Sequence, residues 1–287
     1  MAHVVVLFHA NEVHRDPTGY VIHQLADAWR DRSEKVTYLF GPQTYVPADV
    51  LIVHVDLSVV PKSYLEFAAQ YPVVLNGDLR DIRKSRISQS LVSPRDEWRG
   101  PVIVKSDLNF SGRPERMLEG NWAERRWALA RKISRAGERV RSWNMPVREA
   151  SKYSIFESVD DIPSRWFSHD GSVVERFLPE VENGLYHLRM VQVLGDRRVG
   201  TRLASQEPIV KAGTSIDAAE MEPDEIVDEW CTEHHVDYGK LDYVVHNGEP
   251  ILLDVNKTIG STPGYRDNAA LARSRRNLAE GLYGYLD

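Results

Sequence analysis

The sequence predicts a mixed α/β and α+β chain, in which an N-terminal open parallel sheet precedes antiparallel sheets. Three observations predict this class. Short apolar runs alternate with helical patterns over residues 3–92. From residue 172 onward, strand patterns follow one another through short turns. The chain has 287 residues, of which 42% are hydrophobic, enough for roughly two domains with packed cores.

The first 92 residues predict four strands and two helices. The strands are expected at residues 3–8, 36–40, 50–55 and 73–75, and the helices after Asp16-Pro17 and over residues 61–70. Asp16 is a favourable N-cap residue, and Pro17 suits the first position of a helix. This βαβ alternation predicts a parallel sheet with helices on both faces.

Polar side chains follow the carboxyl ends of these strands, where open parallel sheets bind ligands. The residues are His9, His14, His54 and Asn76. We interpret them as a substrate-binding crevice, although loops are polar for general reasons too. No Gly-x-Gly-x-x-Gly motif follows the first strand, so a dinucleotide-binding fold receives no support.

The remaining elements are read from the same patterns. Strands are expected at residues 101–105, 173–177, 188–194, 199–204, 241–245 and 250–255, and helices at 121–141, 222–235 and 268–285. The segment 121–141 is basic, which is typical of a solvated amphipathic helix or of a lid that attracts anions.

An Asp-x-Asn pair near the end of the chain carries the strongest chemical signal. Asp254 and Asn256 are two residues apart in a predicted strand, so both point to one face. If the preceding hairpin loop is residues 247–249, Asp242 lies directly opposite Asp254; a two-residue loop would place the two carboxylates on opposite faces. Oxygen ligands without His or Cys suit a hard cation such as Mg²⁺.

Composition excludes several other classes. Lys+Arg number 36 against 42 Asp+Glu, and the net charge of −6 disfavours a nucleic-acid partner. The single cysteine excludes a disulfide framework. No apolar run is long enough to span a membrane, and the N-terminus lacks the features of a signal peptide. We therefore expect a soluble, cytoplasmic protein without a membrane partner.

The segment from Asp242 onward resembles the ATP-grasp superfamily of nucleotide-dependent ligases, of the glutathione-synthetase-like carboxylate–amine type. In that family a strand ending in Asp is followed by an acid, one residue and Asn, and then by a Gly-containing loop. Asp242, Asp254, Asn256 and residues 258–260 match this pattern. The resemblance implies that the first three are metal ligands.

Further residues match the family's nucleotide and phosphate positions. The resemblance implies nucleotide contacts from Lys84, Lys105, Glu175, Phe177 and Leu178, and catalytic contacts from Arg189 and Arg202 to the reacting phosphate. The implied cofactors are ATP and Mg²⁺, or Mn²⁺ in its place.

The resemblance also divides the chain. It implies an N-terminal α/β domain at residues 1–92 and a two-lobed ATP-grasp domain with antiparallel sheets. The small lobe is expected at residues 93–171, with a lid loop at 106–120 whose first ten residues contain only one glycine, Gly112. The lobe with the metal and phosphate site is expected at 172–287.

The expected function is an ATP- and Mg²⁺-dependent ligase that activates a small-molecule carboxylate as an acyl phosphate and joins it to an amine. Lys211 is a candidate contact to the substrate carboxylate. Two alternatives keep the nucleotide site: a kinase that phosphorylates a small-molecule hydroxyl, and a non-catalytic nucleotide-binding module.

Overall fold

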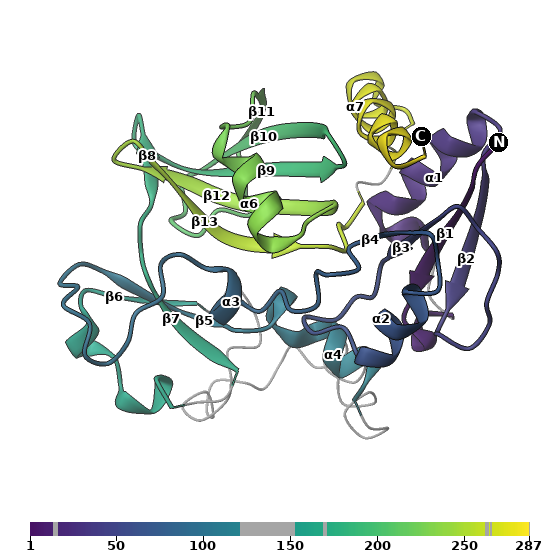
Figure 1. Cartoon of the computed structure of the whole chain (residues 1–287). Helices are drawn as coiled ribbons and strands as arrows, with labels where there is room; N and C mark the ends of the chain where they lie inside the picture. Colours follow the sequence, from purple (N-terminus) through teal and green to yellow (C-terminus); the bar gives the residue numbers. More distant parts are fainter. Residues whose placement is uncertain (14–16, 121–152, 169–170, 262–263, 265, 287) are drawn as a thin grey trace, which may run out of the picture.

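In the part of the chain that the structure describes, three sheets are connected by short helices (Figure 1). The structure is a computed structural model that describes residues 1–287 except 14–16, 121–152, 169–170, 262–263, 265 and 287. The basic helix expected at 121–141 therefore lies outside the described residues. In the described part, no helix is long and apolar enough to cross a membrane.

The first sheet is parallel, as predicted, with strand order β2-β1-β3-β4. Its strands are β1 (His3–Phe8), β2 (Lys35–Phe40), β3 (Val50–Val53) and β4 (Val73–Leu75). Side chains of β1 alternate between two hydrophobic clusters, because successive residues of a strand point to opposite faces. Val4 and Val6 face helix α1 (Val21–Asp31), whereas Val5 and Leu7 face helix α2 (Lys62–Ala68). Helices thus cover both faces.

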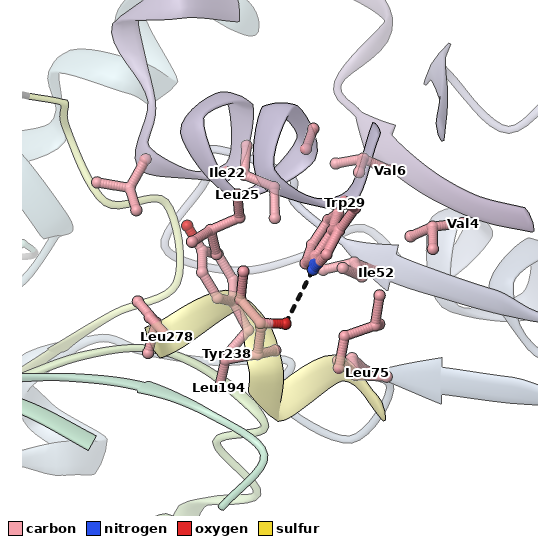
Figure 2. Close-up of a cluster of buried hydrophobic side chains, with 14 of the residues drawn as sticks. Val4, Val6, Ile22, Leu25, Trp29, Ile52, Leu75, Leu194, Tyr238 and Leu278 are labelled. Atoms are coloured by element: carbon pink, nitrogen blue, oxygen red, sulfur yellow. Dashed lines mark hydrogen bonds between the residues drawn. The ribbon is translucent and has the colours of Figure 1, made fainter. Parts of the chain in front are cut away.

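Helix α1 begins later than the sequence predicted. Pro17–Gly19 form a separate 3₁₀ turn, and the N-cap of α1 is Tyr20. The same face of the sheet also receives the C-terminal helix α7 (Ala269–Ala279), which is followed by a 3₁₀ turn at Glu280–Tyr285. The indole nitrogen of buried Trp29 in α1 donates a 2.9 Å hydrogen bond to the carbonyl oxygen of Ala279 (Figure 2).

A small antiparallel sheet follows, with strand order β6-β5-β7. It contains β5 (Val102–Ser106), β6 (Ser154–Phe156) and β7 (Ser172–Arg176), and helix α4 (Arg113–Leu118) follows β5. Strand β7, which lies in the segment predicted at 172–287, pairs with β5. The transition to the next sheet therefore falls after Arg176, in residues 177–179.

The large sheet has six strands in the order β11-β10-β9-β12-β13, with β8 also paired to β9. Its strands are β8 (Glu180–Glu182), β9 (Leu185–Leu194), β10 (Arg197–Ser205), β11 (Asp217–Met221), β12 (Tyr238–His246) and β13 (Glu249–Asn256). Helix α6 (Ile226–His234) packs through Trp230 on one face of this sheet, against Leu241 and Tyr243. The predicted strands 188–194, 199–204, 241–245 and 250–255 all lie within these elements.

The segment 84–92, which begins with helix α3 (Lys84–Ile87), connects the small and large sheets. The backbone N–H of Gln89 donates to the carbonyl oxygen of Leu252 in β13, and the N–H of Val92 donates to Val174 in β7. Figure 1 shows α3 between the two sheets. Side chains of residues 84–92 are therefore held where the two sheets face each other.

Candidate functional site

The hairpin of β12 and β13 places Asp242 opposite Asp254 by a route that the sequence left open. The loop has two residues, Asn247 and Gly248, whose φ angles of +52° and +87° suit the Asn-Gly turn type. A β-bulge next to Asp242 then shifts the register, so that Leu252 pairs with Tyr243 and Asp254 with Asp242. The bulge cancels the slip that a two-residue loop alone would cause.

Four polar residues of this hairpin share one face of the large sheet. Lys240 lies opposite Asn256, as Asp242 lies opposite Asp254, and residues two apart on a strand point the same way. The Nζ of Lys240 lies 2.7 Å from Oδ2 of Asp242. The Nζ of buried Lys84, at the start of α3, lies 3.3 Å from both carboxylate oxygens of Asp254. Each carboxylate is thus paired with one ammonium group.

Burial and neighbouring charges shift the pKa values of two members of this cluster, Asp242 and Lys84. Burial raises the pKa of Asp242 above its usual range, and the Asp254 carboxylate adds to this, while Lys240 and Lys84 oppose it. Burial alone would lower the pKa of Lys84, but Asp254, followed by Tyr153 and Glu175, outweighs it and raises that pKa. The two carboxylates and the two ammonium groups therefore neutralise one another in a poorly hydrated environment.

The residues fit a divalent cation in part. Oδ1 of Asp242 is buried and has no hydrogen-bond partner among the described residues, which leaves an anionic oxygen available as a ligand. Oδ1 of Asn256, in contrast, accepts bonds from the N–H and Oγ1 of Thr258 and from Nδ2 of Asn109. Within the described ranges, no group of three or more His, Cys, Asp and Glu residues is placed to hold a metal. The hairpin therefore supplies two carboxylates and one amide oxygen as candidate ligands for a divalent cation.

The predicted nucleotide residues of the small sheet come together beside this cluster. Nζ of Lys105 in β5 lies 2.6 Å from Oε2 of Glu175 in β7. The same oxygen accepts a 3.5 Å bond from Oγ of Ser90, while Oε1 of Glu175 is buried without a partner in the described chain. Phe177 and Leu178 follow directly, in the link between the small and large sheets.

The loop after β5 has a strained backbone. Phe110, Ser111 and Gly112 have successive φ angles of +45°, +56° and +67°, a region that costs residues with a side chain about 1–3 kcal/mol each. Nearby contacts hold this shape: the backbone N–H of Asn109 donates to Oγ of Ser58, and its side chain reaches Asn256. The glycine-poor loop adopts a glycine-like conformation next to the hairpin.

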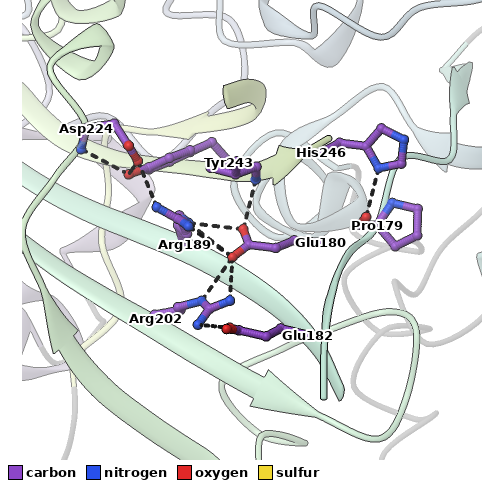
Figure 3. A network of polar contacts seen from close by, with 9 residues as sticks. Pro179, Glu180, Glu182, Arg189, Arg202, Asp224, Tyr243 and His246 are labelled. Carbon is purple, nitrogen blue, oxygen red and sulfur yellow. Dashed lines mark hydrogen bonds and ion pairs between the residues drawn. The ribbon is translucent and has the colours of Figure 1, made fainter. Parts of the chain in front are cut away.

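The strand register places Arg189 and Arg202 on the face of the large sheet opposite to the hairpin carboxylates. Figure 3 shows both arginine side chains pointing toward Glu180. Arg189 is paired with Tyr243, one residue out of phase with Asp242. Both guanidinium groups bind the buried carboxylate of Glu180, at 3.0 Å for Arg189 and 2.7 Å for Arg202. The structure therefore does not bring these arginines together with the hairpin carboxylates.

Glu180 is the centre of a wider network on that face. Arg189 also pairs with Asp224 at 3.0 Å and Arg202 with Glu182 at 2.6 Å. Burial alone would raise the pKa of Glu180, but the hydrogen bond from Arg189 and further donors hold it below its usual range. The two arginines are neutralised by residues of the chain itself.

The residues predicted to form a substrate crevice play different parts. The imidazole of His9 caps the 3₁₀ turn Ala10–Glu12 and stacks on Tyr64. Fully buried Asn76 bonds to the backbone of residues 237 and 238, which ties the first sheet to β12. Lys211 lies in the loop between β10 and β11, and His14 lies outside the described residues.

His54 is a core residue. It is 0% exposed and lies among the rings of Phe8, Tyr20 and Tyr238, so it does not line an open crevice. Burial lowers its pKa to about 3, because the charged imidazolium is disfavoured away from water.

This burial predicts acid sensitivity. Between pH 6.5 and 3 the unfolded chain binds a proton at His54 that the folded chain does not, so stability falls as pH falls below 6.5. The expected loss between pH 7 and pH 5 is about 2 kcal/mol of unfolding free energy. The variant His54→Phe should lose correspondingly less over this interval in urea titrations at both pH values. Equal losses in the two proteins would contradict the buried neutral imidazole.

Lys240 is the residue of this site that the sequence interpretation missed. A signal for it existed, because Lys240 precedes Asp242 by two residues, directly before the predicted strand 241–245, and would share the face of Asp242 if the strand began earlier. The observed strand β12 does begin earlier, at Tyr238. Its partner oxygen, however, depends on the folded hairpin.

No protein-family model matches the sequence, and no curated protein sequence matches it significantly. Solved structures do match. A Chryseobacterium gregarium RiPP-associated ATP-grasp ligase, in complex with ADP and a leader and core peptide, is 10% identical with a TM-score of 0.53, covering 99% of this chain and 97% of that chain. The macrocyclase MdnC from Microcystis aeruginosa MRC, bound with precursor peptide MdnA, is 12% identical with a TM-score of 0.51, covering 98% and 99%.

An ATP-grasp RimK domain protein from Sphaerobacter thermophilus DSM 20745 is 10% identical with a TM-score of 0.50, covering 98% of this chain and 100% of that chain. These matches extend over nearly the whole chain, and they confirm the fold that the Asp-x-Asn segment and the lysines suggested. At such low identities the likeness concerns the fold. The protein thus has the fold of the ATP-grasp ligases.

Proposed function

We propose that the protein is an ATP- and Mg²⁺-dependent ligase that activates a carboxylate as an acyl phosphate and joins it to an amine. The observation that carries the proposal is the position of Lys84. Its ammonium group lies 3.3 Å from the Asp254 carboxylate of the large sheet, and the segment 84–92 that begins with it bonds through Ser90 to Glu175 of the small sheet. A polyphosphate between the two sheets would meet Lys84 together with Lys105, while its metal ion would meet the hairpin carboxylates.

The chain's own residues supply binding and charge compensation. Lys84 and Lys105 would hold nucleotide phosphates, and the unpartnered Oε1 of Glu175 would accept a hydrogen bond from the base, beside the backbone of Phe177 and Leu178. Asp242 and Asp254, with Asn256 after its loop contacts rearrange, would hold the cation. When bound, such a cation neutralises charge on the transferred phosphoryl group.

The proposed reaction needs only ATP, a carboxylate and an amine as reactants. A carboxylate oxygen attacks the γ-phosphorus, the bond to the β-phosphate oxygen breaks, and ADP leaves. An amine nitrogen then attacks the acyl carbon, loses a proton and expels inorganic phosphate. Two of the similar structures contain bound peptides, so we extend the proposed substrates from small molecules to peptide carboxylates and amines.

The test is a product assay with ATP, Mg²⁺ and panels of amino acids, small carboxylates and peptides. We expect phosphate release only when carboxylate and amine are both present, and a hydroxamate when hydroxylamine replaces the amine. ADP formation with the phosphoryl group retained on a hydroxyl would instead identify a kinase. Nucleotide binding without turnover over the whole panel would favour a binding module.

A further inference from the structure

Lys240 is placed to act at the proposed phosphate site, on the face where Arg189 and Arg202 are absent. Its cross-strand partners are Asn256 of β13 and Gln192 of β9, both on the face of Asp242 and Asp254. Its ammonium group bonds to Oδ2 of Asp242 at 2.7 Å and also lies 3.9 Å from Sδ of Met190. The side chain of Lys240 is 19% exposed, so its charge is only partly screened by water.

The charges of the cluster balance before any cation enters. Two carboxylates, Asp242 and Asp254, face two ammonium groups, Lys240 and Lys84. A divalent cation on the same carboxylates would leave two positive charges in excess in a poorly hydrated place, which is costly. The thioether of Met190 cannot compensate a displaced ammonium group, whereas phosphate oxygens can.

We propose, on the basis of the proposed function, that Lys240 remains ion-paired with Asp242 until nucleotide and metal bind together. The ammonium group of Lys240 then contacts the phosphate groups of the nucleotide. Lys240 therefore has opposite effects on two affinities, that for the metal ion and that for the nucleotide. It competes with a metal ion in the absence of nucleotide, and it adds affinity for the polyphosphate in the presence of metal. The ATP-bound state gains a cation that Arg189, paired with Glu180 and Asp224, does not supply.

The experiment measures both consequences in Lys240→Met. Without nucleotide, we expect Mn²⁺ binding, followed by the electron paramagnetic resonance signal of free Mn²⁺, to tighten about tenfold, since a close competing charge pair is removed. With Mg²⁺, binding of a non-hydrolysable ATP analogue should weaken about tenfold in calorimetry, while binding of adenosine stays unchanged. Lys240→Arg should restore analogue binding.

The matched control is Lys62→Met, which removes the same charge from an exposed pair on α2 and should change neither measurement. A merely structural role of Lys240 would weaken both affinities, and unchanged or weaker Mn²⁺ binding by folded Lys240→Met would overturn the inference. If the wild type binds no ATP analogue, the proposed function fails. The Mn²⁺ titration without nucleotide still decides whether Lys240 competes with a metal ion for Asp242.

Discussion

We expect Asp254→Asn to lower the turnover of the proposed ligase by at least about 10³-fold, because loss of a single charge-stabilising contact already costs ~10²–10³ and a metal ion contributes several kcal/mol. Asp254 is one of two carboxylates that share the hairpin face, and the amide cannot replace its charge. The measurement is phosphate release at saturating ATP and Mg²⁺.

The variant also leaves buried Lys84 without its carboxylate partner. Unfolding free energy should therefore fall by about 3 kcal/mol, as for other broken buried pairs. The control is the double variant Lys84→Met with Asp254→Asn, which removes both charges and should recover stability but not turnover. A folded Asp254→Asn protein with wild-type turnover would refute the metal assignment.

The second large effect is expected on stability. Glu180 is only 6% exposed and accepts bonds from Arg189, Arg202 and the backbone N–H of Val245. In Glu180→Gln a neutral amide faces two guanidinium groups, and we expect unfolding free energy to fall by about 3 kcal/mol. Urea denaturation at pH 7 measures this loss.

The pH dependence provides a second readout. Since the pKa of Glu180 is lower in the folded chain, its stabilisation is present above the ordinary pKa of a glutamate and is lost as pH falls through the lowered pKa. Glu180→Gln should therefore lose less stability on acidification than the wild type. Glu182→Gln, whose side chain is 54% exposed and pairs with Arg202, is the control and should cost at most about 1 kcal/mol. Equal losses in the two variants would show that burial of Glu180 is not decisive.

The fold could be predicted because hydrophobic periodicity is local. The run Val4 to Leu7 and its counterparts indicate strands buried on both faces, and the amphipathic pattern after Tyr20 indicates α1. The start of α1 could not be predicted, since Asp16-Pro17 is a favourable start signal but Pro17–Gly19 form a separate turn. Between that turn and α1, Tyr20 has an extended backbone that forms a β-bridge with Gly260, so a contact with a distant segment outweighs the local preference.

Burial explains why two of the residues predicted to line a substrate crevice do not do so. His54 and Asn76 follow strands, as predicted, but both are 0% exposed. Whether a strand-end side chain meets water depends on what packs over it, and here residues 237 and 238 of the large sheet cover Asn76. Those residues lie about 160 positions away in the chain, beyond the reach of any local pattern.

The alternation of residues in each strand follows from the chain alone, because the pleat fixes a period of two: Asp254 with Asn256, and Lys240 with Asp242, must share faces. Which strand faces then coincide depends on pairing between distant segments. A bulge beside Asp242 brought the two carboxylates together despite a two-residue turn, and the pairing of β9 with β12 turned Arg189 to the other face. A shift of one residue reverses every side chain of a strand, and only packing of the whole sheet selects the register.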